Sequence, residues 1–447
     1  MIWVGRLAGP RRVELLFSSF SSSLRRRLAD AGCPSQSHRI NFNFNFNFSM
    51  TQKKGNATQT QTQTQTQTQP RPIRTSTRTS TRPQKDRISL LLDHVLHHIL
   101  SFLPLKLAGR TSILSRRWRH VWASLQRLSF YTDEFAMFGL DRFITYVNAA
   151  LPYCPKQDFQ FFKTFLFTTS PIHLATTTRW ITHAVNNHVR VLHIIIRGGN
   201  VILPRPVLTT HSLQELALFC FPSVKLITPS IITLSQLKIL SLQQTDINSA
   251  FLKKIISGCP MLEHLNLHSC GITFFRLHSM MLTKLVMENC TIRTKRENKF
   301  CISTPNLVHL HFNQGCGTLT HHEKLNQMFE LDVPNLKSLI LGGNWVASYP
   351  DAVPFFLQHS PMLEKLTLIC FQNPGELNEM KSLGASINLS FQCQNLNSAE
   401  IICHESDKRI LHLTKVLKKN GISNLDLTQD YSSIENDCLK MLYDVWY

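Results

Sequence analysis

The side chains of this sequence that could bind a polar ligand gather in short apolar segments of its middle part. In each segment, histidine, lysine, asparagine or glutamate alternates with leucine or a similar residue. Imidazole, ammonium, amide and carboxylate groups in such a set can bind anions and polar ligands, and imidazoles also bind zinc. The residues are His264, Asn266, His268, Lys284, Glu288, His309, His311, Asn313 and, in a later segment, Lys365.

No signature of catalysis accompanies these residues. The sequence contains no G-x-S-x-G, no glycine-rich phosphate loop and no H-E-x-x-H, and the HHEK at 321–324 lacks a second spaced histidine. The 12 cysteines form no C-x-x-C pair and no zinc-finger spacing, which indicates reduced, mostly buried thiols of a cytosolic or nuclear protein. We therefore expect a non-enzymatic chain without a metal site or a cofactor.

The elements that position the polar residues are repeats of the form L-x-x-L-x-L. They follow one another at intervals of 20 to 33 residues, which is the period of leucine-rich repeats. Each unit predicts a short strand that cannot bury its leucines alone, so the units are expected to stack into a solenoid with a parallel sheet on its concave side. The first apolar residues of the units are Phe162, Val189, Leu213, Leu237, Leu262, Leu282, Leu307, Leu336, Leu363, Leu396 and Ile422.

Strand alternation decides which residues face a ligand. The leucines point inward, and their neighbours, the histidines among them, line the concave surface. Neighbouring strands are ~4.8 Å apart, so His264 and His309, two repeats apart, are expected to lie about 10 Å from each other. That separation disfavours zinc and leaves two interpretations, a polar surface for a protein or small-molecule ligand and a solvated face.

Two details of the repeats predict local structure. Cys270 and Cys290 follow strands at the position where these repeats place asparagine or cysteine, so their thiols are expected to bond backbone groups of the neighbouring coil. On the convex side, Asn248 is expected to cap a helix that Gly258 ends. A second convex helix is predicted over about 407–421.

Residues 86–122 precede the repeats and form the densest apolar segment with helical spacing. Apolar residues recur there at helical intervals, Pro104 interrupts them, and arginines are interleaved in the second half. Two or three short helices are therefore expected. About 40 residues cannot bury a good core alone, so the segment must pack on a neighbour or offer an apolar surface to a partner.

The same segment resembles a plant F-box. The resemblance rests on DRIS at 86–89, VLHHILSFLP at 95–104 and TSILSRRWR at 111–119. It implies a three-helix module that docks on the Skp-type adaptor of a cullin-RING ubiquitin ligase, while the rest of the chain captures a substrate protein. The candidate adaptor-binding residues are Leu91, Leu92, Val95, Leu96, Ile99, Leu100, Leu103, Pro104, Leu107, Ser115 and Trp118.

Three positions depart from the usual F-box pattern. Leu92 replaces a common proline, His94 a common glutamate, and Leu105 a small polar residue. Leucine lacks the pre-set φ of proline at the start of a helix, and histidine removes a charge that suits a helix N-terminus. Two functions follow: a substrate-recruiting subunit of an SCF-type ligase, and, as the alternative, a leucine-rich-repeat interaction scaffold whose weakened F-box does not assemble a ligase.

The resemblance extends into the repeats. GCPMLEHL at 258–265 and RWI at 179–181 resemble the leucine-rich-repeat region of plant F-box proteins. A helix over 140–151, before the turn at 152–155, is expected to cap the solenoid. The last hundred residues are irregular, and the sequence leaves open whether a further C-terminal module is present.

The expected fold is α/β, with four parts along the chain. Residues 1–85 are expected to form a disordered basic tail, 86–126 the F-box, 127–160 a capping helix and linker, and 161–447 the solenoid. The tail holds 14 lysines and arginines against two acids, a net charge of +12 out of +20 for the whole chain. Its first 40 residues leave two interpretations open, an organelle transit peptide and an extended gene model with translation starting at Met50.

The composition also limits the partners. No run of 18 or more apolar residues predicts a membrane span. Outside the tail the chain is only mildly basic, so nucleic acid is not an expected partner, and a nucleic-acid-associated protein acting through the tail is kept as a rival. We expect the nucleus or the cytoplasm as the location, with organelle import as the rival.

Overall fold

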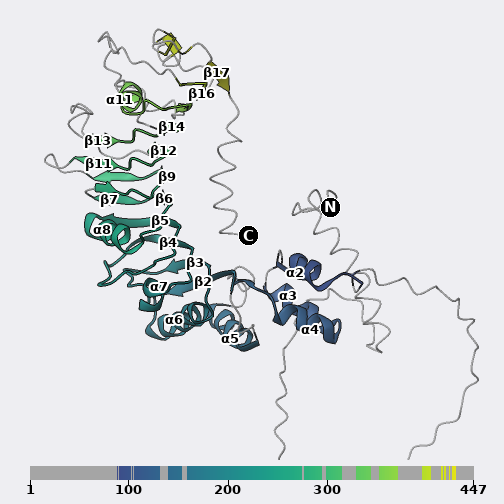
Figure 1. The fold of residues 1–447 in the computed structure, drawn as a ribbon. Helices are drawn as coiled ribbons and strands as arrows, with labels where there is room; N and C mark the ends of the chain where they lie inside the picture. The colour runs from purple at the N-terminus through teal and green to yellow at the C-terminus, as the bar shows by residue number, and fades with distance from the viewer. Residues whose placement is uncertain are drawn as a thin grey trace, which may run out of the picture. The chain divides into compact units, whose positions relative to one another are not determined.

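The computed structural model describes most of the chain after residue 87. The described residues are 88, 90–101, 103, 105–130, 139–153, 159–273, 276–293, 299–314, 329–343, 352–370 and 395–403, with short pieces at 414–415, 417–418, 422 and 425–428. The chain divides into two units, Met1–Pro83 and Gln84–Tyr447, and every described element belongs to the second (Figure 1). The predicted tail and most of the second convex helix lie outside the described residues.

A module of three short helices opens the described chain. Ser115 begins the last of them, because its hydroxyl accepts a hydrogen bond from the backbone N–H of Trp118 at 3.4 Å. The elements of the module are α2 (Asp93–Ser101), α3 (Leu105–Arg110), the 3-10 turn η1 (Thr111–Ile113) and α4 (Arg116–Ala123). These three helices confirm the predicted three-helix module.

A parallel sheet runs through the rest of the described chain. Among the described residues it has 14 strands, and twelve form one path in which each strand pairs in parallel with the next. Figure 1 shows the labelled strands of this path stacked in chain order. The path is β1 (Arg127–Ser129), β2 (Phe161–Phe167), β3 (Val191–Arg197), β4 (Glu215–Lys225), β5 (Ile239–Asn248), β6 (His264–His268), β9 (Lys284–Glu288), β12 (His309–Gln314), β14 (Ser338–Gly343), β15 (Lys365–Cys370), β16 (Ser398–Cys403) and β17 (Leu425–Thr428).

The leucines of successive repeats form the core of the solenoid. The unit starts from Val189 to Leu396 each lie two residues before a strand, so the predicted repeats and the parallel sheet are confirmed. Because side chains alternate along a strand, the aligned leucines all point inward. One row of paired leucines, none more than 1% exposed, comprises Leu240, Leu265, Leu285, Leu310, Leu339 and Leu366.

The first repeat starts three residues earlier than predicted. Phe162 pairs with Leu192, the second inward position of its repeat, so the counterpart of Val189 is Phe159 and not Phe162. Phe159 is completely buried. The polar residues of the segment FQFFKTFLF do not alternate with its apolar residues, and β2 is buried along its whole length, so alternation could not reveal the register.

The sheet also begins earlier than predicted. Strand β1 lies within 127–160, the expected linker, and pairs in parallel with the first three residues of β2. Helix α5 (Leu140–Ala150) and the 3-10 turn η3 (Leu151–Tyr153) follow where a helix was predicted. Phe143 of α5 lies edge-on to Phe165 and Trp180, with ring centroids 5.5 and 5.9 Å apart. Helix α5 therefore packs on the first repeats and closes that end of the core.

Helices and short strands connect the strands of the main sheet on its convex side (Figure 1). The sequence did not predict the short strands among them, because three or four residues with one or two apolar side chains carry no periodic signal. Three of these strands form a separate parallel sheet in the order β13-β11-β8, and β7 and β10 extend the main sheet beside β5. The elements are α6 (Pro171–Asn186), α7 (Arg205–Thr209), α8 (Ser249–Gly258), β7 (Gly271–Thr273), β8 (Arg276–His278), β10 (Thr291–Arg293), β11 (Phe300–Ser303), β13 (Phe329–Asp332) and α11 (Ala352–Gln358).

Helix α8 is the convex helix that the sequence predicted. The Asn248 side chain accepts a hydrogen bond from the backbone N–H of Phe251 at 2.8 Å, which confirms the predicted cap. Gly258 ends the helix without a left-handed φ, unlike a usual C-terminal glycine. A Cβ at this position would lie 2.3 Å from the carbonyl oxygen of Ile232. Glycine is needed there because another backbone segment approaches it closely.

A ladder of short side chains crosses three neighbouring repeats, within β5 and just after β6 and β9. Thr245, Cys270 and Cys290 each come directly after a residue with φ of 51° or 52°. The Thr245 hydroxyl and the Cys270 sulfur are 3.3 Å apart. The thiol of Cys270 donates to the carbonyl of Leu242 at 3.4 Å, and that of Cys290 to the carbonyl of Leu267 at 3.3 Å. Both bonds reach the preceding coil, which confirms the predicted role of the two cysteines.

Candidate functional site

The helices of the N-terminal module meet at a small core of their own. Leu96 is completely buried, and Leu100 and Trp118 are 1% and 4% exposed. The predicted contribution of these three side chains to adaptor binding stays a prediction, and in the folded module all three are buried. They hold α2 and α4 together, because a module of this size needs much of its apolar stripe for itself.

Other apolar side chains of the module stay in contact with solvent. We call Leu90, Leu92, Ile99, Leu107 and Ile113 the exposed apolar set, and Leu90, Leu92 and Ile113 are more than 60% exposed. Leu92, Ile99 and Leu107 are among the predicted adaptor-binding residues, whereas Leu90 and Ile113 are not. The run Leu90-Leu91-Leu92 before the helix was the available signal for Leu90.

The remaining candidate adaptor residues have mixed positions. Leu91, Val95 and Leu103 are half-buried. Ser115 is exposed and caps α4. Pro104 lies outside the described residues. The structure thus divides the predicted apolar face into an inner part that holds the helices and an outer part that is open to a partner.

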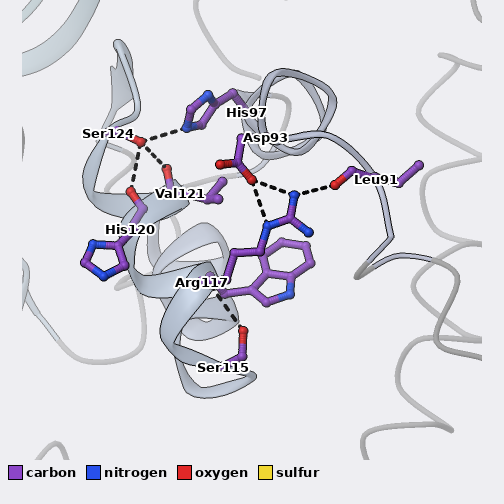
Figure 2. A network of polar contacts seen from close by, with 9 residues as sticks. Leu91, Asp93, His97, Ser115, Arg117, His120, Val121 and Ser124 are labelled. Atoms are coloured by element: carbon purple, nitrogen blue, oxygen red, sulfur yellow. Dashed lines mark hydrogen bonds and ion pairs between the residues drawn. The ribbon is translucent and has the colours of Figure 1, made fainter.

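Two polar links join α2 to α4, as Figure 2 shows. The Arg117 guanidinium donates to one Asp93 carboxylate oxygen through Nε at 2.8 Å and Nη2 at 2.6 Å, and also to the Leu91 carbonyl. At the other end of the contact, Nε2 of His97 lies 2.7 Å from the hydroxyl of Ser124. These bonds join the two short helices at both ends of their contact.

The start of α2 compensates in part for the residues that depart from the F-box pattern. The Leu92 carbonyl accepts hydrogen bonds from the N–H groups of Val95 and Leu96 at 3.0 and 3.1 Å, so Leu92 occupies the cap position. Asp93, directly after it, supplies an acid in the first turn. His94, where glutamate is common, is exposed.

On the concave face, strand pairing arranges the predicted binding residues in rows. His264, Lys284, His309, Ser338 and Lys365 pair in turn across five strands, and we call them the basic row. The two histidines thus lie on either side of Lys284. A second row consists of Ser241, Asn266, Val286, His311 and Ile340, and a third of Gln243, His268, Glu288, Asn313 and Gly342.

Several polar side chains of the second and third rows bond a neighbour in the same row. His268 and Glu288 form an ion pair at 3.1 Å, and their side chains are 18% and 11% exposed. Asn266 donates to the hydroxyl of Ser241 at 3.0 Å and is buried. In the basic row, by contrast, His309 and Lys365 are exposed and His264 and Lys284 half-buried. The open part of the concave face is therefore its basic row.

The imidazoles of the basic row are biased toward their neutral form. Burial lowers the pKa of His264 and of His309, and the ammonium group of Lys284 lowers the pKa of both further. The carboxylates of Glu263 and Glu215 offset part of this effect at His264. Near neutral pH the two lysines of the row are thus charged and its two histidines neutral. A bound anion would favour the protonated form of the histidines.

The exposed apolar set and the basic row are both suited to binding a partner molecule. Within the part of the chain that the structure describes, no three His, Cys, Asp or Glu side chains are grouped to hold a metal ion, and no helix is long and apolar enough to cross a bilayer. A small helical module with exposed apolar side chains, followed by a solenoid with a polar concave face, defines a protein with two separate binding surfaces.

Comparisons with known families assign both parts. Residues 88–130 match the F-box domain, and residues 177–329 match the leucine-rich repeats of the FBD-associated F-box protein At5g56370. The first match spans α2 to β1, and the second runs from α6 to the start of β13.

Relatives in Arabidopsis thaliana are named as F-box proteins, and two of the three below also as LRR-repeat proteins. F-box/LRR-repeat protein 25 is 30% identical over 236 residues, which are 52% of this chain and 86% of that protein. FBD-associated F-box protein At4g10400 is 30% identical over 270 residues, 57% of this chain and 64% of that protein. F-box/LRR-repeat protein At3g03360 is 33% identical over 191 residues, 41% of this chain and 39% of that protein.

The chain belongs to the F-box/LRR-repeat proteins of plants. Members of this family are typically non-catalytic adaptors, and an F-box generally indicates binding to a Skp-type adaptor. An adaptor-type role is therefore the function that family and structure support together.

Proposed function

We propose that this chain is a substrate-recruiting subunit of an SCF-type cullin-RING ubiquitin ligase. The F-box docks on a Skp-type adaptor through the exposed apolar set, and the repeats hold a target protein on the concave face. The chain supplies no reacting group. Its contribution is positional, because a substrate held near a charged conjugating enzyme meets it at a high effective concentration.

The observation that carries the proposal is the exposed apolar set itself. A small module that leaves Leu92 and Ile113 about two-thirds uncovered has more apolar surface than its own core can use. Covering a wholly exposed side chain of this kind contributes about 1.5–3 kcal/mol, so covering these five partly exposed side chains favours docking and offsets part of the cost of association.

A co-purification experiment tests the docking step. The full chain and its Leu92→Asp, Ile113→Asp variant are each co-expressed with a Skp-type adaptor, and the adaptor retained on the tagged chain is measured. We expect the variant to lose the adaptor while its circular dichroism and thermal midpoint stay near those of the wild type, since both residues are exposed.

Ile172→Asp, Ile202→Asp is the matched control. Ile172 and Ile202 are 76% and 63% exposed, so this variant introduces the same two charges on similarly open isoleucines away from the F-box. This control should retain the adaptor. Equal retention by the wild type and the Leu92→Asp, Ile113→Asp variant would refute docking through the exposed apolar set.

An interaction scaffold with a weakened F-box is the second candidate. It is favoured by Leu92 and His94, which stand where proline and glutamate are common in the family. If it is correct, the native chain fails to retain the adaptor, and a Leu92→Pro, His94→Glu variant gains it. Retention by the native chain removes this candidate.

A further inference from the structure

The basic row crosses five strands of the concave face without an acidic residue in it. From His264 through Lys284 and His309 to Ser338 and Lys365, consecutive members pair directly across β6, β9, β12, β14 and β15. All five side chains lie on one face, because paired residues of parallel strands point the same way.

The nearby acids are already paired with other groups. Glu263 and Glu364 each precede a member of the row, and they accept hydrogen bonds from Lys238 and Lys337 at 2.8 Å. Within the concave face, Glu288 is paired with His268. The ammonium groups of the row are therefore available to a ligand that brings its own negative charge.

The row contains two cationic centres at a fixed separation. The first is Lys284 between His264 and His309, where three nitrogen-bearing side chains lie on adjacent strands. The second is Lys365, three strands beyond Lys284. At ~4.8 Å per strand the two lysines are roughly 14 Å apart, which equals about four residues of an extended chain at ~3.4 Å each.

We propose that the basic row binds an extended acidic segment of the substrate protein, with two anionic side chains four residues apart. One carboxylate or phosphate lies over Lys284 between the two histidines, and the other pairs with Lys365. Residues i and i+4 of an extended segment point to the same side, so both anions reach the sheet. This inference rests on the proposed substrate-recruiting function and adds the class of target.

The histidines add a pH dependence to this binding. His264 faces Glu215, Glu263, Lys284 and His309, and His309 faces Lys284. Burial and Lys284 hold both imidazoles neutral at neutral pH, and a bound anion favours their protonated form. Binding therefore takes up protons, and the affinity for the glutamate peptides, whose carboxylates stay ionised in this range, should rise as pH falls from 7.5 to 6.0.

Fluorescence anisotropy with labelled 12-residue peptides tests the proposal on the full chain. The peptides are built of glycine and serine and carry two glutamates, spaced at i and i+2, i and i+4 or i and i+6. In two further sets with the same spacings, phosphoserine or glutamine replaces both glutamates. We expect the i, i+4 peptides to bind most tightly, the glutamine set not to bind, and Lys284→Glu, Lys365→Glu to weaken binding by about tenfold or more.

Three further variants make the test specific. Lys225→Glu, Lys253→Glu changes the same number of charges on exposed lysines outside the row and should bind like the wild type. His264→Gln, His309→Gln should keep binding at pH 7.5 and lose the gain at pH 6.0. The glutamate and phosphoserine sets distinguish a constitutively acidic target from a phosphorylated one.

Some outcomes would overturn the inference. It fails if Lys284→Glu, Lys365→Glu binds the i, i+4 peptides as well as the wild type, if spacing has no effect, or if a single-stranded RNA oligonucleotide binds more tightly than any peptide. Adaptor co-purification is measured on the same variants. Adaptor retained with peptide binding absent rejects only this inference, whereas loss of adaptor from the wild type rejects the proposed function.

Discussion

The F-box and the solenoid use their apolar residues in opposite ways. In the F-box one helical stripe serves two purposes, because Leu96 and Leu100 fill the core while Leu92 and Ile99 stay open. In the solenoid the division follows the alternation of the strand, with Leu285 completely buried and the neighbouring Lys284 half-buried on the concave face. The difference comes from geometry: a helical stripe is more than 100° wide, whereas a strand has only two sides.

This contrast explains what the two regions can recognise. The F-box offers apolar side chains held by a small core and two polar links, and so suits a constant partner with a matching apolar surface. The solenoid keeps its leucines inside and offers a polar face whose composition changes from repeat to repeat. We infer that substitutions on the concave face change the target without changing the fold, whereas substitutions in the F-box stripe affect both.

The largest expected effect comes from a substitution in the core of the F-box. Leu96→Ala removes a completely buried side chain and should destabilise the module by about 2–5 kcal/mol. Leu92→Ala, four positions earlier and 66% exposed, should change stability by less than about 0.5 kcal/mol. Limited proteolysis between α2 and α4, together with chemical denaturation, measures both. Equal costs would contradict the division of the stripe into inner and outer parts.

A smaller effect is expected where the solenoid packs backbone against backbone. Gly258→Ala places a Cβ against the Ile232 carbonyl, and forcing that contact apart should cost about 1–3 kcal/mol. Gly199→Ala is the control, since no atom lies within 4 Å of a Cβ there. Thermal unfolding of the two variants compares them, and a neutral Gly258→Ala would show that the coil relaxes more easily than its geometry suggests.

The smallest effect concerns the polar link of the F-box. Asp93 and Arg117 are 60% and 38% exposed, so their ion pair should contribute only about 0.2–1 kcal/mol. Asp93→Asn is expected to lower stability by no more than this amount and to reduce adaptor retention only slightly. A double-mutant cycle with Arg117→Ala measures the coupling, and a coupling above that range would make the link a main determinant of how the helices lie.

The sequence was sufficient for the parts of the fold with a strong periodic signal. The leucines at 213, 237, 262 and 282 identified their strands, and Asn248 identified the start of α8. Strand β1 was not predictable, because its three residues contain one buried side chain, Leu128. The register of β2 was hidden by a segment that is apolar on both faces.

The candidate sites were predictable to different degrees. The polar residues of the concave face follow from alternation alone, but their rows depend on pairing, which placed Lys284 between two histidines. Which F-box residues are inside could not be read from the helical period, since Leu96 and Ile99 belong to one stripe. Only the positions of the other two helices separate them.

The short strand β1 has a consequence for where a fragment of this protein can begin. β2 is buried at all seven positions, and β1 covers its first three residues with a strand that begins with Arg127, whose guanidinium lies 4.5 Å from the ring centroid of Phe161. A fragment that starts at residue 160 would leave an apolar strand edge open to other molecules. Fragments of the repeats intended for crystallisation or peptide screening should therefore begin before Arg127, or they will aggregate.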